Sequence, residues 1–177
     1  MKILLRKTIF VIISICYIFG GVFFSPAHAL TEATEEDMLL RLIQTTFPEA
    51  VSYSTSDDPG IWMNVYNAAE TVIGYAVVTS PYTDDVVGYM GPIPLLICID
   101  TQEKIKEVTL IHHFETPGLM EILLKEGFFN VWTGEHWRAA STKEVDAISG
   151  ATLSSQAIID TLKHRLNTMN SPQKKEE

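Results

Sequence analysis

Cysteine is scarce in this sequence. Among its 177 residues only Cys16 and Cys98 are cysteines. Cys16 stands in an apolar N-terminal run, and Cys98 stands in the apolar stretch 95–99, where a thiol is most simply a small core side chain. Because only one cysteine lies beyond the N-terminal run, the sequence excludes both a disulfide framework and a cysteine metal cluster.

Basic residues are few as well. The chain has 13 lysines and arginines against 22 aspartates and glutamates, which gives a formal net charge of −9. An acidic chain without a basic stripe repels a nucleic-acid backbone and is not attracted to an anionic membrane surface. The sequence also lacks an internal repeat and the Gly-x-Ser-x-Gly element of serine hydrolases. Nucleic-acid binding and this kind of serine hydrolysis are therefore excluded.

The first 29 residues have the layout of a secretory signal peptide. A basic start precedes an almost wholly apolar run at residues 9–24, and Ala27 and Ala29 offer the small side chains that a signal peptidase reads. The apolar run is shorter than the about 20 residues that a membrane-spanning helix needs. We therefore predict cleavage after Ala29 and export to the periplasm or the extracytoplasmic face of the membrane. An uncleaved membrane anchor is the alternative.

The rest of the chain, residues 30–169, is predicted to be one domain with strands in its middle and helices at both ends. Thr34 caps the first expected helix, which Pro48 ends. Predicted strands cover residues 61–66, 71–79, 95–100 and 105–112, and further helices cover residues 119–125 and 155–169. This order predicts an α+β fold, in which a mostly antiparallel twisted sheet is flanked by the N- and C-terminal helices. The polar residues 170–177 are predicted to form a disordered tail.

One segment suggests chemistry as well as packing: Asp146-Ala147-Ile148-Ser149-Gly150-Ala151-Thr152-Leu153-Ser154. It stands just before the last helix, whose first N–H groups are unpaired and whose dipole attracts an anion. Its small residues let the backbone approach a bulky ligand, and Thr152 offers a hydroxyl for an ester bond. Asp146 is close enough in sequence to bind a metal or accept a proton during attachment. The alternative is a plain turn in which Thr152 or Ser154 caps the helix.

Two further segments are candidates for a ligand site. In Glu115-Thr116-Pro117-Gly118 the Pro-Gly pair makes a rigid turn, which can aim Glu115 and the Thr116 hydroxyl at a ligand. A plain connection between strand and helix is the alternative. In Gly88-Tyr89-Met90-Gly91-Pro92-Ile93 the glycines could let a flat ring approach the backbone, with Tyr89 stacked on that ring or packed in the core.

Histidines and aromatic residues give weaker signals. Neighbours on a strand point to opposite faces, so His112 and His113 do not converge on a metal. We expect one of them to face a ligand pocket and the other to face solvent. An aromatic cluster is expected in the core, with a wall around a cofactor as the alternative; it comprises Phe128, Phe129, Trp132 and Trp137.

Taken together, these segments resemble a known family. The stretch from Asp146 to Thr152 resembles the flavinylation motif of the bacterial FMN-binding domain. Three further stretches agree with that domain in the same order: Phe47-Pro48-Glu49-Ala50, Gly88-Tyr89-Met90-Gly91-Pro92-Ile93 and His113-Phe114-Glu115-Thr116-Pro117-Gly118. Each motif alone is weak evidence for the family, but four motifs in the same order across residues 47–166 are a specific indication of it. One departure is the hairpin turn at residues 101–104, which lacks the usual glycine.

The FMN-binding domain occurs in subunits of the sodium-translocating NADH:quinone oxidoreductase and of related ion-pumping ferredoxin oxidoreductases. It also occurs in the nitrous oxide reductase maturation regulator and in other exported flavoproteins. The resemblance implies that a flavin transferase takes FMN from FAD with magnesium and joins its phosphate to Thr152. No protein residue is then expected to be a catalytic acid or base, and no resident metal is expected.

The resemblance also assigns the remaining cofactor contacts. The phosphate and ribityl chain would be surrounded by Asp146, Ser149, Gly150, Ala151, Leu153 and Ser154. The flavin side would be lined by Glu115, Thr116 and Gly118, with Tyr89 and Gly91 as further candidates.

The predicted function is electron transfer by an exported FMN flavoprotein, as opposed to stand-alone catalysis. Expected partners are a membrane redox complex, an iron–sulfur protein or a cytochrome, which the acidic surface would orient on encounter. Three alternatives stay open at this point. They are a module that binds FMN without a covalent bond, a redox sensor or maturation factor, and a secreted domain with an empty pocket.

Overall fold

The structure, a computed structural model, describes residues 34–54 and 62–170. The predicted signal peptide at residues 1–29 lies outside the described residues, as does the predicted tail beyond Asn170. No helix within the described ranges is long and apolar enough to cross a membrane.

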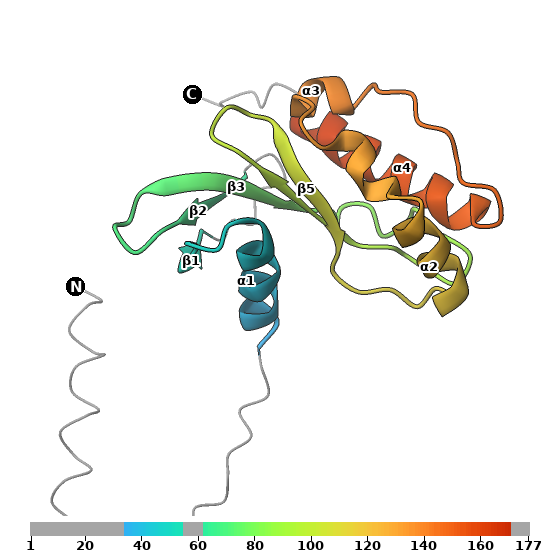
Figure 1. The fold of residues 1–177 in the computed structure, drawn as a ribbon, viewed down its shortest axis with the longest axis horizontal. Helices are drawn as coiled ribbons and strands as arrows, with labels where there is room; N and C mark the ends of the chain where they lie inside the picture. The colour runs from blue at the N-terminus through green and yellow to red at the C-terminus, as the bar shows by residue number, and fades with distance from the viewer. Residues whose placement is uncertain (1–33, 55–61, 171–177) are drawn as a thin grey trace, which may run out of the picture. The chain divides into compact units, whose positions relative to one another are not determined.

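The described strands form one antiparallel sheet in which neighbours in sequence are neighbours in space (Figure 1). In sheet order they are β1 (Ser52–Tyr53), β2 (Met63–Tyr66), β3 (Val72–Val78), β4 (Leu95–Ile99) and β5 (Ile105–Leu110). Short turns join β2 to β3 and β4 to β5, whereas a longer connection, residues 79–94, joins β3 to β4. Together with the helices, this sheet confirms the predicted α+β class.

Strand β4 is buried on both faces because different helices cover them. The buried apolar side chains form two core clusters, one on each face of the sheet. Leu95, Ile97 and Ile99 belong to the larger cluster, which also holds Trp132 and Leu162. Leu96 and Cys98 belong to the smaller cluster, which also holds Ile43 and Phe47. This is the two-residue alternation of a strand. It explains why β4 reads as an unbroken apolar run in the sequence, since neither face meets water.

Helix α1 (Glu35–Thr46) covers the face of the smaller cluster. It starts as predicted: the Thr34 hydroxyl accepts a hydrogen bond from the Asp37 N–H, and the Asp37 carboxylate accepts one from the Thr34 N–H. Phe47, just after the helix, lies against Gly74 of β3. A β-carbon at Gly74 would clash with the Phe47 ring, so this close approach requires glycine.

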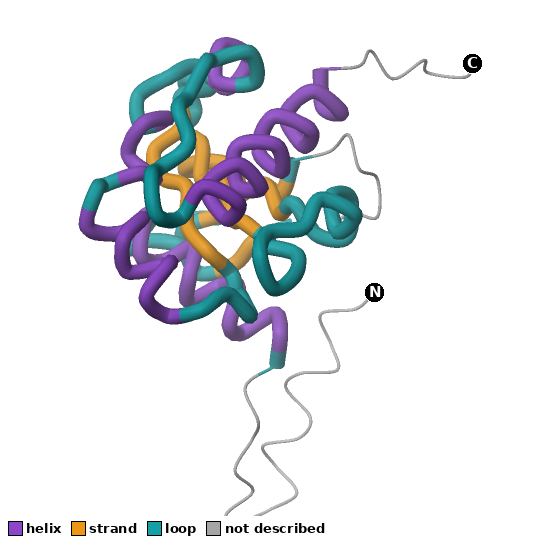
Figure 2. Tube along the Cα trace, turned by 90° about the vertical axis from the view of Figure 1, so that its right-hand side faces the viewer, coloured by secondary structure: helices purple, strands orange, loops and turns teal. Residues whose placement is uncertain are grey.

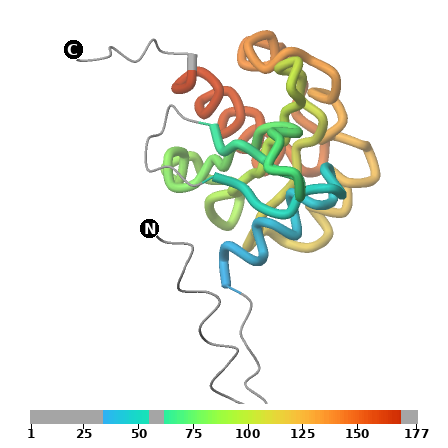
Figure 3. Tube along the Cα trace, turned by 90° about the vertical axis from the view of Figure 1, so that its left-hand side faces the viewer, coloured from blue at the N-terminus to red at the C-terminus, as the bar shows by residue number. Residues whose placement is uncertain are grey.

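The opposite face of the sheet carries the other described helices. They are α2 (Pro117–Lys125), the 3-10 helix η2 (Phe128–Trp132), α3 (Trp137–Ala140) and α4 (Thr152–Asn170). Figure 2 shows α4 as the long helix near the C-terminus, lying across the strands. Figure 3, from the opposite side, shows α1 in blue and α4 in red on different sides of the strands. The predicted aromatic cluster does pack in the core, with Phe128, Trp132 and Trp137 buried and Phe129 at the edge.

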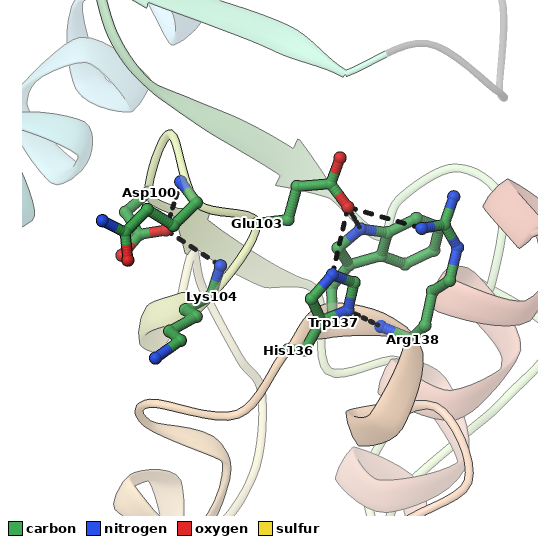
Figure 4. A network of polar contacts seen from close by, with 7 residues as sticks. Asp100, Glu103, Lys104, His136, Trp137 and Arg138 are labelled. Atoms are coloured by element: carbon green, nitrogen blue, oxygen red, sulfur yellow. Dashed lines mark hydrogen bonds and ion pairs between the residues drawn. The ribbon is translucent and has the colours of Figure 1, made fainter.

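Two acidic side chains stabilise the hairpin turn between β4 and β5, which has no glycine (Figure 4). The Asp100 carboxylate accepts hydrogen bonds from the N–H groups of Gln102 and Lys104, at 2.8 and 2.9 Å. Glu103 occupies the left-handed region, with a φ of +63°. A glycine would adopt this conformation without steric cost, so Glu103 needs compensating contacts.

The carboxylate of Glu103 supplies those contacts by bonding to α3 (Figure 4). One of its oxygens accepts a 3.0 Å hydrogen bond from the Trp137 indole N–H. Nitrogens of His136 and Arg138 lie 3.1 and 3.4 Å from the same oxygen. The hairpin turn is therefore fixed to α3, and the departure from the usual glycine is compatible with an ordered turn.

Burial of Cys98 gives a testable prediction. Burial raises the pKa of the Cys98 thiol to about 11, from an ordinary value of 9.0. Because the thiolate is the reactive form, we expect iodoacetamide at about pH 8 to alkylate native Cys98 at least roughly 100-fold more slowly than the unfolded chain. The rate is measured by mass spectrometry of the Cys98 peptide. Equal rates in the native protein and in concentrated guanidinium chloride would contradict the buried position of Cys98 in β4.

Candidate functional site

The segment before α4 folds into a tight turn at Gly150. This residue has a φ of +86°, in the left-handed region that glycine adopts without steric cost. The Ala151 N–H donates to the Ile148 carbonyl at 3.1 Å, and α4 begins with the next residue, Thr152. The turn therefore leads directly into the helix, with Thr152 at the first helical position.

A buried serine holds this turn against the helix. The Ser155 hydroxyl oxygen accepts a 2.9 Å hydrogen bond from the Ile148 N–H, and the same hydroxyl donates to the Ala151 carbonyl at 2.9 Å. Ser155 is fully buried, so its hydroxyl depends on these protein partners. The sequence pattern does not single out Ser155, because an exposed capping serine would leave the same pattern.

The N-terminal end of α4 suits an anion. The N–H groups of Thr152, Leu153 and Ser154 precede the first hydrogen bond of the helix, which joins the Ser155 N–H to the Ala151 carbonyl at 2.9 Å. Such groups need partners outside the helix, and the dipole of a 19-residue helix favours a negative charge there. This end of α4 therefore has the chemistry of a phosphate-binding site.

The Thr152 hydroxyl is exposed and weakly held. It donates to the Ile148 carbonyl over 3.3 Å, a long hydrogen bond, and the same carbonyl also accepts the Ala151 N–H. Esterification of the hydroxyl would remove its proton and still leave the Ile148 carbonyl with a partner. The hydroxyl oxygen of Thr152 is thus accessible for bond formation without disrupting the turn.

The capping alternative does not describe this turn. A capping hydroxyl accepts a hydrogen bond from an N–H group of the first helical turn. Here the Thr152 hydroxyl donates backward to Ile148, and the Ser154 hydroxyl donates to the Glu115 carboxylate at 2.5 Å. Both hydroxyls therefore serve contacts outside the helix.

A cavity of about 480 Å³ opens beside this end of α4, and its exposed lining is largely apolar. Its volume falls within the range of about 300–1,000 Å³ that is typical of small-molecule sites. Leu119 of α2 forms part of the wall, although an apolar helix residue gives no sign in sequence that it faces a ligand. A second cavity, about 340 Å³ between β5 and η2, is lined by none of the predicted site residues.

The structure brings most of the predicted site residues together at the α4 cavity. The cavity is lined by Tyr89, Thr116, Gly150, Ala151, Thr152, Leu153 and Ser154. The predicted residues that do not line it are Gly91, Glu115, Gly118, Asp146 and Ser149. Asp146 and Ser149 are exposed, and a β-carbon at Gly118 would meet nothing within 4 Å.

The carboxylate of Glu115 connects two of the four motifs with the first turn of α4, just after the motif that ends at Thr152. This side chain is buried, and its oxygens accept hydrogen bonds from the Met90 N–H at 2.8 Å and from the Ser154 hydroxyl at 2.5 Å. The loop that holds Met90 is a tight turn in which the Gly88 N–H donates to the Gly91 carbonyl at 2.8 Å. The fourth motif, residues 47–50, contributes to the smaller core cluster on the other face of the sheet.

Neither histidine of the 112–113 pair lines the α4 cavity. His112 is exposed and borders a separate cavity beside α1. The Nδ1 atom of His113 is buried without a hydrogen-bond partner among the described residues.

The sequence is similar to an FMN-binding domain family and to subunits of oxidoreductase complexes. A sequence model of the family described as "FMN-binding domain" matches residues 88–167, which include every predicted site residue. The G subunit of the ion-translocating oxidoreductase complex of Methanosarcina acetivorans is 28% identical over 153 residues, which are 78% of this chain and 79% of that protein. The protein of the same name from Haemophilus influenzae is 28% identical over 166 residues, 81% of this chain and 78% of its own length.

A further relative is the G subunit of the proton-translocating ferredoxin:NAD(+) oxidoreductase complex of Clostridium ljungdahlii. It is 28% identical over 91 residues, which are 48% of this chain and 49% of that protein.

The buried Ser155 provides a test of the turn. Ser155→Ala removes the acceptor for the Ile148 N–H, and an unsatisfied buried donor costs about 1–3 kcal/mol. We expect the free energy of unfolding, measured by urea titration, to fall by that amount. Thr168→Ala is the matched control, because its hydroxyl donates to the His164 carbonyl at 3.0 Å on the exposed side of the same helix. A loss no larger than that of the control would argue against the role given to Ser155.

Proposed function

Because this chain belongs to the FMN-binding domain family through residues 88–167, we propose that it is an exported flavoprotein that carries FMN on Thr152. The observation that carries this proposal is the exposed Thr152 hydroxyl at the N-terminal end of α4, on the border of the 480 Å³ cavity. A phosphoester at Thr152 would place its negative charge at the positive end of the helix.

The residues present fit FMN in both of its parts. The first turn of α4 offers N–H groups to the phosphate, and the small residues Gly150 and Ala151 leave room at the same place. The apolar side chains Leu119 and Leu153 and the ring of Tyr89 offer surface for a flavin ring. We assign Thr116, at the edge of the cavity, to the flavin side as well.

The proposed attachment is a phosphoryl transfer from FAD. The Thr152 hydroxyl oxygen bonds to the flavin-side phosphorus, the bond between the two phosphates breaks, AMP leaves and the hydroxyl proton is released. A flavin transferase with magnesium would supply the catalysis. Asp146 and Ser149 are exposed beside the turn, so we assign them to contacts made during attachment.

We further propose that the loaded protein transfers electrons to or from a membrane redox complex. FMN supplies the redox chemistry when bound, and the protein supplies its position and surroundings. The similarity to subunits of ion-translocating and ferredoxin:NAD(+) oxidoreductase complexes supports this role. An iron–sulfur protein or a cytochrome on the extracytoplasmic side would be the direct partner, oriented by the acidic charge of this chain.

The attachment site can be tested by substitution of Thr152. Protein produced in a host with an active flavin transferase should yield a Thr152 peptide whose mass includes the FMN phosphoester. Thr152→Ala should lose the added mass completely, because no other atom replaces the acceptor oxygen. Thr168→Ala is the control and should remain loaded, because it removes a hydroxyl that donates to the carbonyl four residues earlier in the same helix, away from the cavity. An unmodified Thr152 peptide from the wild-type chain in that host would refute the proposal.

A domain that holds FMN without a covalent bond is the second candidate, because the apolar walls at Tyr89 and Leu119 do not depend on an ester. The two candidates differ after denaturation. We expect the yellow colour to stay with the acid-precipitated protein, since a phosphoester survives unfolding. Colour that moves entirely into the supernatant would instead identify the non-covalent module.

A further inference from the structure

The cavity beside α4 is built from two walls that are far apart in the sequence. Tyr89 lies in the loop 88–91, and Thr152 to Ser154 form the first turn of α4. Among the described residues, no hydrogen bond joins this loop directly to α4. A hydrogen-bonded link between the two walls therefore has to run through a third element.

The carboxylate of Glu115 is that element. One oxygen accepts a hydrogen bond from the Met90 N–H, 25 residues earlier, and the other accepts one from the Ser154 hydroxyl, 39 residues later. On one side the donor Met90 is the chain neighbour of Tyr89, which lines the cavity, and on the other side the donor Ser154 lines it directly. Glu115 itself is only 4% exposed and does not line the cavity.

The loop 88–91 packs closely against the Glu115 carboxylate. A β-carbon added at Gly88 would lie 2.7 Å from a Glu115 carboxylate oxygen and 2.8 Å from the Cδ1 atom of Ile93. Gly88 is therefore required by close approach, because any larger residue would displace Glu115 or Ile93. A buried carboxylate without hydrogen-bond donors is costly in free energy, so displacement of Glu115 away from its two donors is disfavoured.

We propose that Glu115 is a positioning residue that fixes the loop 88–91 and the first turn of α4 at the spacing needed for flavin attachment. This role rests on the proposed function of Thr152 as the acceptor. Glu115 acts through Met90 and Ser154 and does not touch the flavin. The ligand would be a flavin phosphoester, whose phosphate the N-terminal end of α4 would hold and whose ring the apolar lining of the cavity would contact.

The test compares two substitutions of similar size. Glu115→Gln keeps a carbonyl oxygen that can accept the Met90 N–H, whereas Glu115→Met fills the space and accepts nothing. Glu107→Gln is the matched control, because the Glu107 carboxylate accepts a 2.5 Å hydrogen bond from the Thr46 hydroxyl away from the α4 cavity. Each variant is made in the full chain, in a host without flavin transferase.

Two measurements are made on each variant. Amide hydrogen exchange reports the loop 88–91, with α1 as an internal reference. Mass spectrometry of the Thr152 peptide then reports the rate of FMN attachment after purified flavin transferase, FAD and magnesium are added.

For Glu115→Met we expect exchange in the loop to rise, and attachment to fall, by about tenfold or more, with α1 unchanged. Glu115→Gln should stay within about threefold of the wild type in both measurements. If Met supports attachment and loop protection as well as Gln does, Glu115 only fills space and the proposal is overturned. If the wild type is not modified at all, the proposed function fails, while the exchange data still decide whether Glu115 holds the loop.

A second variant covers the case in which Glu115→Met does not fold. Ser154→Ala breaks the contact between Glu115 and α4, removes one hydroxyl from the cavity wall and keeps the bond from the Met90 N–H. Attachment should then fall by about tenfold while loop exchange stays at the wild-type rate. Attachment at the wild-type rate in Ser154→Ala would overturn the proposal.

Discussion

The burial of β4 on both faces is the constraint on which the arrangement of this domain depends. Leu96 and Cys98 require cover from α1, and the other face of the strand requires cover from the later helices. Helix α4 must therefore lie across the sheet. Near its C-terminal end, the buried Arg165 donates from Nε to the Val78 carbonyl at 2.8 Å. Near its N-terminal end, Ser154 bonds to Glu115. With both ends fixed, the first turn of α4 is held beside the loop 88–91.

The long elements of the fold are predictable from the sequence because their periodicity extends over many residues. The predicted first and last helices and the longer strands all occur, with ends shifted by a few residues. The sequence did not predict β1, η2 or α3. Strand β1 has only two residues and exists through its pairing with β2, while η2 follows Gly127, whose φ is +63°. Such short elements depend on tertiary contacts more than on local preference.

The candidate site is predictable in part for the same physical reason. The turn at Gly150 and the hydroxyl of Thr152 are local features, which the small residues before an apolar helix predict. The contacts that organise the site are not local. Glu115 and Ser154 are 39 residues apart, and spacing in the sequence gives no sign that one donates to the other. Leu119 and Ser155 likewise read as ordinary helix residues until the chain is folded around them.

Under the proposed attachment at Thr152, the turn before α4 has a consequence for the order of folding and attachment. Its shape depends on Ile148, Ala151 and Ser155, and the buried position of Ser155 exists only once the helix has packed on the sheet. An enzyme that reads the shape of this turn would act on folded molecules and ignore unfolded ones. Attachment of a cofactor would then be a record of successful folding. The amount of bound flavin in a preparation would then set a lower limit on the number of copies that had folded.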